Sequence, residues 1–196
     1  MKSFKQHIFE KLKVTKHTYN LFPKTKEELK QMIKDEISKN GNECSLNHID
    51  VSRITDMSNL FCDSKFNGDI SEWNVSNVED MANLFYRSTF NGDISGWNVS
   101  NVKNMDYMFL SSNFNGDISD WDVSNVKYMH AMFHESTFNG DISRWDVSNV
   151  KDMGFMFAGS KFNGDTSNWD VSNVIDMYKT FNNSPLEKNP PKWYKK

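Results

Sequence analysis

The sequence predicts an α/β repeat solenoid, in which short coils of chain stack on one another behind an N-terminal helical cap. The segment Phe-Asn-Gly-Asp, followed by Trp-Asn/Asp-Val-Ser-Asn-Val, occurs five times with a period of 24 residues. The same step taken backwards from Trp73 reaches Ile49, so a degenerate first coil precedes the five regular ones. An amphipathic helical pattern lies upstream of that coil. A fixed period of roughly 20 to 29 residues is typical of solenoids with side-by-side coils.

Residues 1–41 do not repeat and are predicted to form the helical cap. Three apolar residues spaced four apart predict a short amphipathic helix within residues 4–12. A second helix is predicted to begin after Thr25, because Thr25 and Glu28 have the spacing of a capping box. Gly41 marks its end. We expect this helix to cover the first coil, whose apolar face and unpaired backbone edge would otherwise be open.

Residues 42–183 are predicted to form six coils of similar design. Within one coil, residues 67–68 predict a turn and residues 69–71 a short strand. Apolar residues at helical spacing within residues 78–85 predict a short helical or 3₁₀ segment. Coils built from one strand and one helical turn are those of the leucine-rich-repeat class.

Residues 184–196 are predicted to form a partial last coil and tail. One further step of 24 residues from Trp169 reaches Trp193. Pro190 and Pro191 interrupt the pattern there. Because proline cannot donate to a hydrogen-bond ladder, we expect them to prevent another chain from pairing with the C-terminal edge of the solenoid.

Charge is distributed unevenly along the chain. The repeated body carries a net charge of −11, whereas residues 1–41 carry +5 and the tail from Ser184 carries +3. An acidic body argues against nucleic acid as the partner of the main surface. Two isolated cysteines, Cys44 and Cys62, fit a reduced interior, although one disulfide is compatible with the sequence. The sequence shows no signal peptide, lipid anchor or membrane-spanning run, so it reads as a soluble, intracellular chain.

The repeat unit resembles the BspA-like leucine-rich repeat, a domain of unknown function in mycoplasma lipoproteins and bacterial surface proteins. The unit Phe-Asn-Gly-Asp-Ile-Ser-x-Trp-Asn/Asp-Val-Ser-Asn-Val-x-x-Met-x-x-Met/Leu-Phe carries this resemblance over about residues 46–181. The resemblance implies a role in adhesion or protein interaction without catalysis, often at a cell surface.

Residues that recur at one position of every coil form columns, and each column could either bind a ligand or serve the packing of the coils. A row of Trp could stack sugars, but identical large apolar residues at every step are what buried layers require. The column of Asp that begins at Asp69 could bind cations, yet its place after Asn-Gly favours capping of turns. The column of Asn that begins at Asn77 is predicted to bond loop backbone. Catalysis needs a unique constellation of residues, which no repeated column provides.

The candidate binding residues are therefore sought where one coil differs from the next. Aromatic side chains stand at variable positions of the Met-rich segment where other coils have Ala, Gly, Asp or Asn, and such residues are enriched in interfaces. These predicted partner-binding residues are Tyr86, Tyr107, Tyr128, His130, His134, Phe155 and Tyr178. A second variable column lies beside the predicted strand and comprises Glu72, Gly96, Asp120, Arg144 and Asn168. Ordinary solvated variation is the alternative for both sets.

Two groups of residues suggest metal sites, and neither site is predicted. His130 and His134 are four residues apart, but the His-Glu-x-x-His order is absent. Cys44, His48 and Cys62 lack a fourth ligand.

The sequence thus predicts a binding or interaction module that is not an enzyme and uses no cofactor. Its partner is expected to be a protein or a glycan, with no nucleic acid and no membrane insertion, and the chain is expected to be a monomer or weak oligomer. The alternative is a structural component that associates or docks through its ends.

Overall fold

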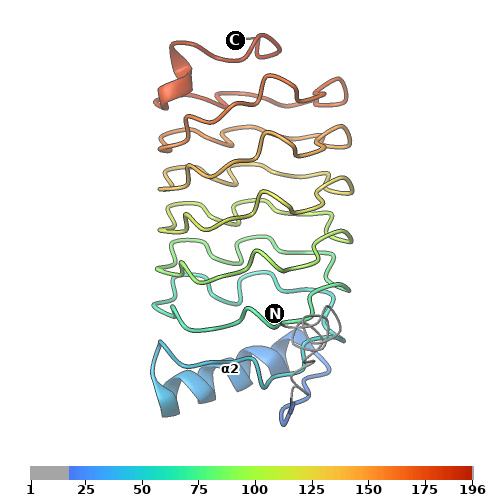
Figure 1. The fold of residues 1–196 in the computed structure, drawn as a ribbon, viewed down its shortest axis with the longest axis vertical. Coiled ribbons are helices and arrows are strands. Elements are labelled where there is room, and N and C mark those ends of the chain that lie inside the picture. Colours follow the sequence, from blue (N-terminus) through green and yellow to red (C-terminus); the bar gives the residue numbers. More distant parts are fainter. Residues whose placement is uncertain (1–17, 196) are drawn as a thin grey trace, which may run out of the picture.

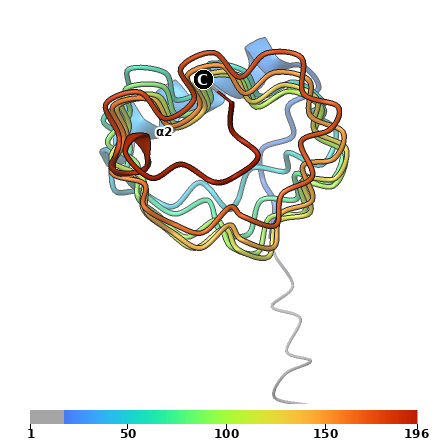
Figure 2. The ribbon, with the colours of Figure 1, turned by 90° about the horizontal axis from the view of Figure 1, so that it is seen from above.

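The computed structural model describes residues 18–195, which form a column of chain turns, each lying on the one before (Figure 1). Viewed along the column, the turns superimpose (Figure 2). Parallel bridges join residues 24 apart, from Asp56 with Asp80 at one end to Asp152 with Asp176 at the other. Within the described residues these pairings stay isolated bridges, and none extends into a strand.

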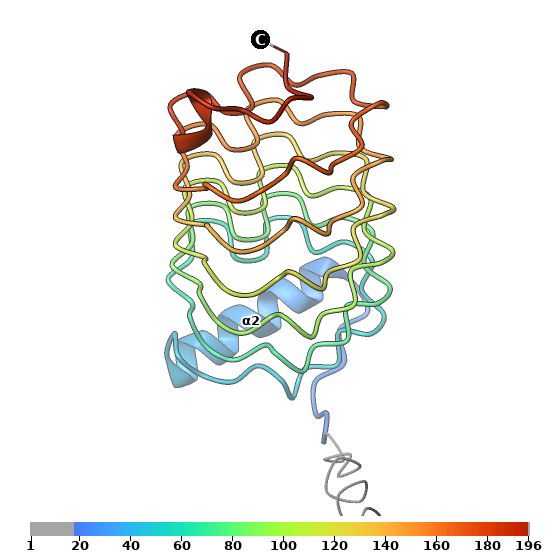
Figure 3. The ribbon, with the colours of Figure 1, turned by 45° about the horizontal axis from the view of Figure 1, so that its top comes forward.

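Helix α2, Lys26–Asn40, lies across the first turn, as the capping box predicts (Figures 1 and 3). The Thr25 hydroxyl accepts the amide N–H of Glu28 at 3.2 Å, and Gly41 follows the last turn with φ of 86°. Its apolar face is buried through Leu29 and Ile33. The predicted helix within residues 4–12 lies outside the described residues.

Polar contacts attach α2 to the first turn of the column. The Lys26 ammonium lies 3.0 Å from the Asp56 carboxylate, and the His48 imidazole lies 3.4 Å from Glu36. These contacts hold α2 against the first turn.

The tryptophans form a buried column, which confirms the packing interpretation. Their exposed fractions are only 3 to 5% for the five regular copies. Each indole N–H donates to a backbone carbonyl 27 residues earlier, at 3.0 to 3.2 Å, so the polar end of the ring is satisfied inside the core. The donors are Trp73, Trp97, Trp121, Trp145 and Trp169. Trp193 continues the column, with its ring centroid 6.2 Å from that of Trp169.

The Met-rich segment differs from its prediction, because it forms β-turns in place of the expected helical or 3₁₀ segment. Residues 81–84 and 85–88 each close with an amide-to-carbonyl bond of 3.2 Å. Their third residues, Asn83 and Arg87, have φ of 56° and 50°. Left-handed residues at this position are typical of type II turns and end any helix. The two helices of the described residues are α2 and the 3₁₀ helix η1, Pro185–Glu187, outside the repeats.

Pairing between turns runs along this same segment, away from the predicted strand at residues 69–71. The amides of Met81, Asn83 and Phe85 all donate at 2.9 Å to carbonyls of the following turn. At the predicted strand the described residues show a single bridge, between Ser45 and Asp69. Alternate amides therefore join each turn to the next.

The Asp and Asn columns confirm the turn-capping and backbone-bonding interpretations. Each carboxylate of the Asp column accepts the amide N–H of the Ser two residues later, at 2.8 to 3.0 Å. These bonds from the Ser amide and hydroxyl hold the pKa of Asp93, Asp117, Asp141 and Asp165 below the ordinary Asp value. The Asn column, starting at Asn77, donates from its amide groups to Ser carbonyls of the preceding turn at 2.7 to 2.8 Å.

Candidate functional site

Four of the predicted residues form a continuous line of side chains across successive turns, which we call the aromatic row. It comprises Tyr107, His130, Phe155 and Tyr178, with neighbouring ring centroids 5.2, 5.9 and 5.4 Å apart. All three contacts are edge-to-face, the arrangement that aromatic quadrupoles favour. His134 joins from the side, 6.1 Å from Phe155. The row is partly open to solvent, and Tyr178 is 59% exposed.

Tyr86 and Tyr128 stand apart from the aromatic row, since no ring contact joins either to it within residues 18–195. Tyr86 lies beside Arg87, whose guanidinium carbon is 6.0 Å from the ring centroid. Tyr128 is 44% exposed and belongs to the column of bridged residues, where its neighbours are Asn104 and Asp152.

The backbone at two members of the row is unusual for aromatic residues. Tyr107 and Phe155 have φ of 59° and 56°, in the left-handed region. The same position is left-handed in every turn; it is Asn59 and Asn83 in the first two turns, Ala131 in the fourth and Lys179 in the last. Asparagine tolerates this conformation well. A bulky side chain there costs on the order of 1 kcal/mol. The rings are therefore kept at positions that the turn itself disfavours.

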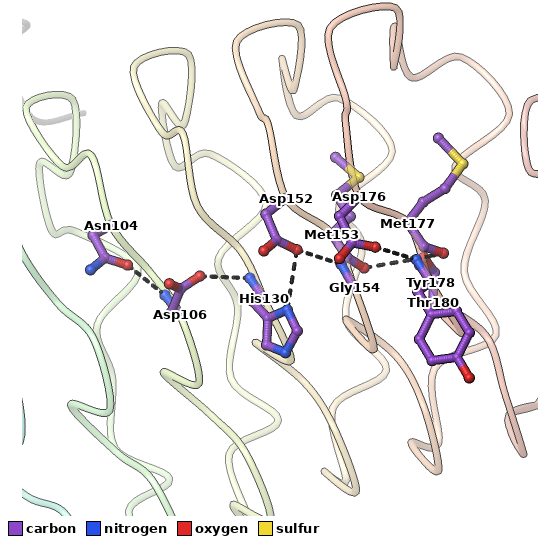
Figure 4. A network of polar contacts seen from close by, with 10 residues as sticks. All are labelled: Asn104, Asp106, His130, Asp152, Met153, Gly154, Asp176, Met177, Tyr178 and Thr180. Carbon is purple, nitrogen blue, oxygen red and sulfur yellow. Dashed lines mark hydrogen bonds and ion pairs between the residues drawn. The ribbon is translucent and has the colours of Figure 1, made fainter.

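A line of polar contacts runs beside the row (Figure 4). In most turns an Asp or Asn caps the amide two residues later; Asp152 accepts from Gly154 at 2.8 Å, and Asp176 from Tyr178 at 2.7 Å. Tyr128 occupies this position in the fourth of the six turns and has no carboxylate. The Asp106 carboxylate of the preceding turn takes its place and accepts the His130 amide N–H at 2.7 Å.

The His130 ring is fixed by its neighbours in the next turn. Its Nδ1 lies 3.1 Å from an Asp152 carboxylate oxygen. Gly154 provides the space, because a Cβ there would lie 3.0 Å from that Nδ1 and 3.2 Å from the carboxylate. In Figure 4 the His130 and Tyr178 rings extend to the same side of the line of carboxylates. Asp106 and Gly154 thus depart from the repeat together with the ring that they hold, whereas Asp152 matches it.

The electrostatic environment of the row is negative. Burial raises the pKa of Asp106, and the neighbouring carboxylates Asp152 and Asp80 raise it further, although the hydrogen bond from His130 opposes them. Burial also raises the pKa of Tyr107, with Asp106 and Asp152 adding to the effect. Both shifts show that a further negative charge is unfavourable here.

The two histidines are not placed to share a metal ion. The Phe155 ring contacts both His130 and His134, and within residues 18–195 no group of three His, Cys, Asp or Glu side chains is arranged to hold one. Among the described residues, none provides a hydrogen-bond partner for the buried His134 Nδ1. Cys44 and Cys62 are free thiols, and burial is the first cause of their raised pKa values.

Helix α2 and the column of turns together match a family model. The model of the family described as "Mycoplasma protein of unknown function, DUF285" matches twice, over residues 27–133 and 110–193. The chain belongs to this family. No curated protein and no solved structure matches it.

The second variable column of this family member forms a polar surface. Arg144 and Asp120 lie 2.9 Å apart in an exposed ion pair, which contributes little to stability.

Cavities lie at both ends of the column that residues 18–195 form. One of about 220 Å³ is lined by Tyr178, Phe181 and Tyr194 and adjoins the end of the aromatic row. Another of about 420 Å³ lies between α2 and the first turn. Neither helix of the described residues has the length and apolar character needed to cross a membrane.

Proposed function

We propose that this chain is a non-catalytic binding module that holds a protein partner on its aromatic row. The observation that carries the proposal is the left-handed backbone of Tyr107 and Phe155. The position is left-handed in every turn, and other turns fill it with Asn, Ala or Lys, so the turn itself does not require an aromatic ring. Residues kept in a conformation that costs free energy are often functional. Exposed aromatics are also the side chains that most often anchor protein interfaces.

The fold class of this module is proposed to be a leucine-rich-repeat-like solenoid of the BspA type. Parallel bridges between residues 24 apart and a column of identical buried residues support that assignment. Solenoids of this class present extended surfaces on which a few varied residues select the partner. An adhesin-like role follows from the same resemblance.

The test replaces the two strained rings with the residue that the repeat itself uses. The Tyr107→Asn/Phe155→Asn variant keeps a side chain suited to the turn, so it should fold normally. A partner captured by the wild-type chain from its native source is purified, and its affinity is measured for both chains. We expect a loss of at least about tenfold, because an anchoring aromatic residue contributes more than about 1 kcal/mol.

The matched control is Tyr86→Asn, which removes an aromatic ring outside the row. The substitution introduces asparagine, the residue found at the same position of the last turn as Asn182. We expect its affinity to equal that of the wild type. Unchanged binding by the double variant, or an equal loss in the control, would rule the aromatic row out as the binding surface. A glycan that binds in place of any protein would change the partner class.

A second candidate function is association through the ends of the column. It is favoured by the amides of Met177, Lys179 and Phe181, which make no hydrogen bond within the described residues although their counterparts in earlier turns do. Light scattering over a concentration series tests it. A monodisperse monomer at high concentration would exclude this candidate and leave the first one standing.

A further inference from the structure

We infer that the aromatic row receives a positively charged side chain, arginine or lysine, from the protein partner. The inference rests on the proposed function and adds the chemistry that the partner must supply. It is carried by the placement of two carboxylates beside the rings.

The two carboxylates are Asp106 and Asp152, and they lie on either side of His130. Asp106 accepts the His130 amide at 2.7 Å, whereas Asp152 lies 3.1 Å from the imidazole Nδ1. Within residues 18–195 neither is paired with a lysine or an arginine. The ionised form of Asp106 is disfavoured, because the carboxylate is partly buried and lies near the negative charge of Asp152. A cation from outside would offset the repulsion between the two carboxylates.

The rings beside these carboxylates are suited to the same ligand. An aromatic face attracts a cation within about 6 Å of its centroid, and the attraction grows when water is excluded. The chain already uses this interaction at the end of the row, where the Lys179 ammonium lies 5.1 Å from the Tyr178 centroid. The Tyr107 ring contacts the His130 ring and the Asp106 carboxylate accepts the His130 amide N–H, so ring and carboxylate border the same residue.

Other ligand classes fit the surface less well. An anion would face two carboxylates and the repeated acids of the body, whose net charge is −11 over residues 42–183. A neutral sugar would gain from the rings but leave the carboxylates without a charged partner. The charge of the ligand therefore distinguishes the alternatives.

The experiment uses two probes of nearly equal shape, N-acetyl-arginine amide and N-acetyl-citrulline amide, of which only the first is charged. Binding to the full chain is followed by NMR on the ring signals of His130 and Phe155. We expect saturable shifts with the arginine probe and at least about tenfold weaker binding of the citrulline probe. Added salt should weaken the arginine probe alone, because screening acts on charges.

Variants locate the interaction. Asp106→Asn and Asp152→Asn keep the acceptor oxygens of their hydrogen bonds and remove the charges, so each should weaken arginine binding at least threefold. Asp141→Asn removes one exposed charge outside the row and should have no effect. We expect Asp106→Asn to unfold at the same urea concentration as wild type or a higher one, which separates lost charge from lost structure.

The outcomes are distinct. Equal binding of both probes, binding of neither, or no effect of the two charge variants would overturn the inference. If the Tyr107→Asn/Phe155→Asn variant loses the partner while the two charge variants keep it, the row binds a partner without recognising a cation. If arginine binds the row but the partner binds the Tyr107→Asn/Phe155→Asn variant as it binds the wild type, the proposed function fails instead.

Discussion

Replacing Trp121 with Phe in the middle of the column tests how the turns are held together. The Trp121 indole N–H donates at 3.1 Å to the Ile94 carbonyl in a buried position. That carbonyl also accepts the Trp97 amide at 3.1 Å, so the substitution leaves it with one donor. The lost hydrogen bond then costs about 1 kcal/mol. Loss of roughly 40 Å² of apolar surface adds about 1 kcal/mol, and a void of roughly 30 Å³ adds up to about 0.7 kcal/mol.

The expected total is therefore about 2 to 3 kcal/mol, measured as the free energy of unfolding in urea at pH 7. Trp193→Phe is the matched control, because its indole donates to the Thr166 carbonyl at 2.7 Å with the same chemistry at a partly exposed site. Water can replace that bond, so we expect a loss below about 1 kcal/mol. Equal losses at the two positions, or a loss below about 1 kcal/mol for Trp121→Phe, would refute the reasoning.

Three further predictions concern the row and the ladders. Gly154→Ala should displace the His130 ring, seen as a changed imidazole NMR signal, whereas Gly96→Ala, where a Cβ would meet nothing within 4 Å, should not. Tyr107→Asn should change the free energy of unfolding by less than about 1 kcal/mol, because relief of left-handed strain offsets the lost ring contact; a loss above about 2 kcal/mol in urea would contradict this. Hydrogen bonds from Ser lower the pKa values of the Asp column, as at Asp141. The stability that these carboxylates contribute to the fold is therefore complete above the pKa of an unfolded Asp, about 4, and is lost as pH falls through the folded pKa. The urea midpoint should fall on acidification below about pH 4, and a midpoint that stays constant throughout the acid range would disprove it.

The core and the N-terminal helix could be predicted because both leave a periodic signal. Buried layers need the same large side chain at each step, so the Trp column follows from its spacing. Helix α2 carries a cap, an apolar stripe and a stop within a few residues.

The Met-rich segment could not be predicted from spacing, because two consecutive β-turns imitate a helix. Residues 81–84 and 85–88 place apolar side chains three and four apart, as a helix does. Left-handed residues distinguish such turns from a helix, but some of them, such as Arg87 and Tyr107 in the next coil, are not residue types that favour turns. The sequence therefore predicts pairing between turns at residues 69–71, whereas it occurs beside the Met positions.

The aromatic row could be predicted as a set of residues, although without its carboxylates. Tyr107, His130 and Phe155 stand out because they differ from neighbouring turns, whereas Asp152 matches the repeat and attracts no attention. The signal that could have found Asp106 is Tyr128, which takes the place of a capping acid and so requires one from elsewhere.

The one-way bonding of the Met-rich segment has an evolutionary consequence. Every turn there offers amides to its successor, as Met81 does to Asn104, so any turn can follow any other without altering the core. Gain or loss of one 24-residue unit then preserves the scaffold and changes which surface side chains become neighbours. Loss of the unit that contains His130 would bring Tyr107 and Phe155, which share one position of the repeat, into adjacent turns. New binding surfaces can thus arise by recombination of whole units, without a change in any buried residue.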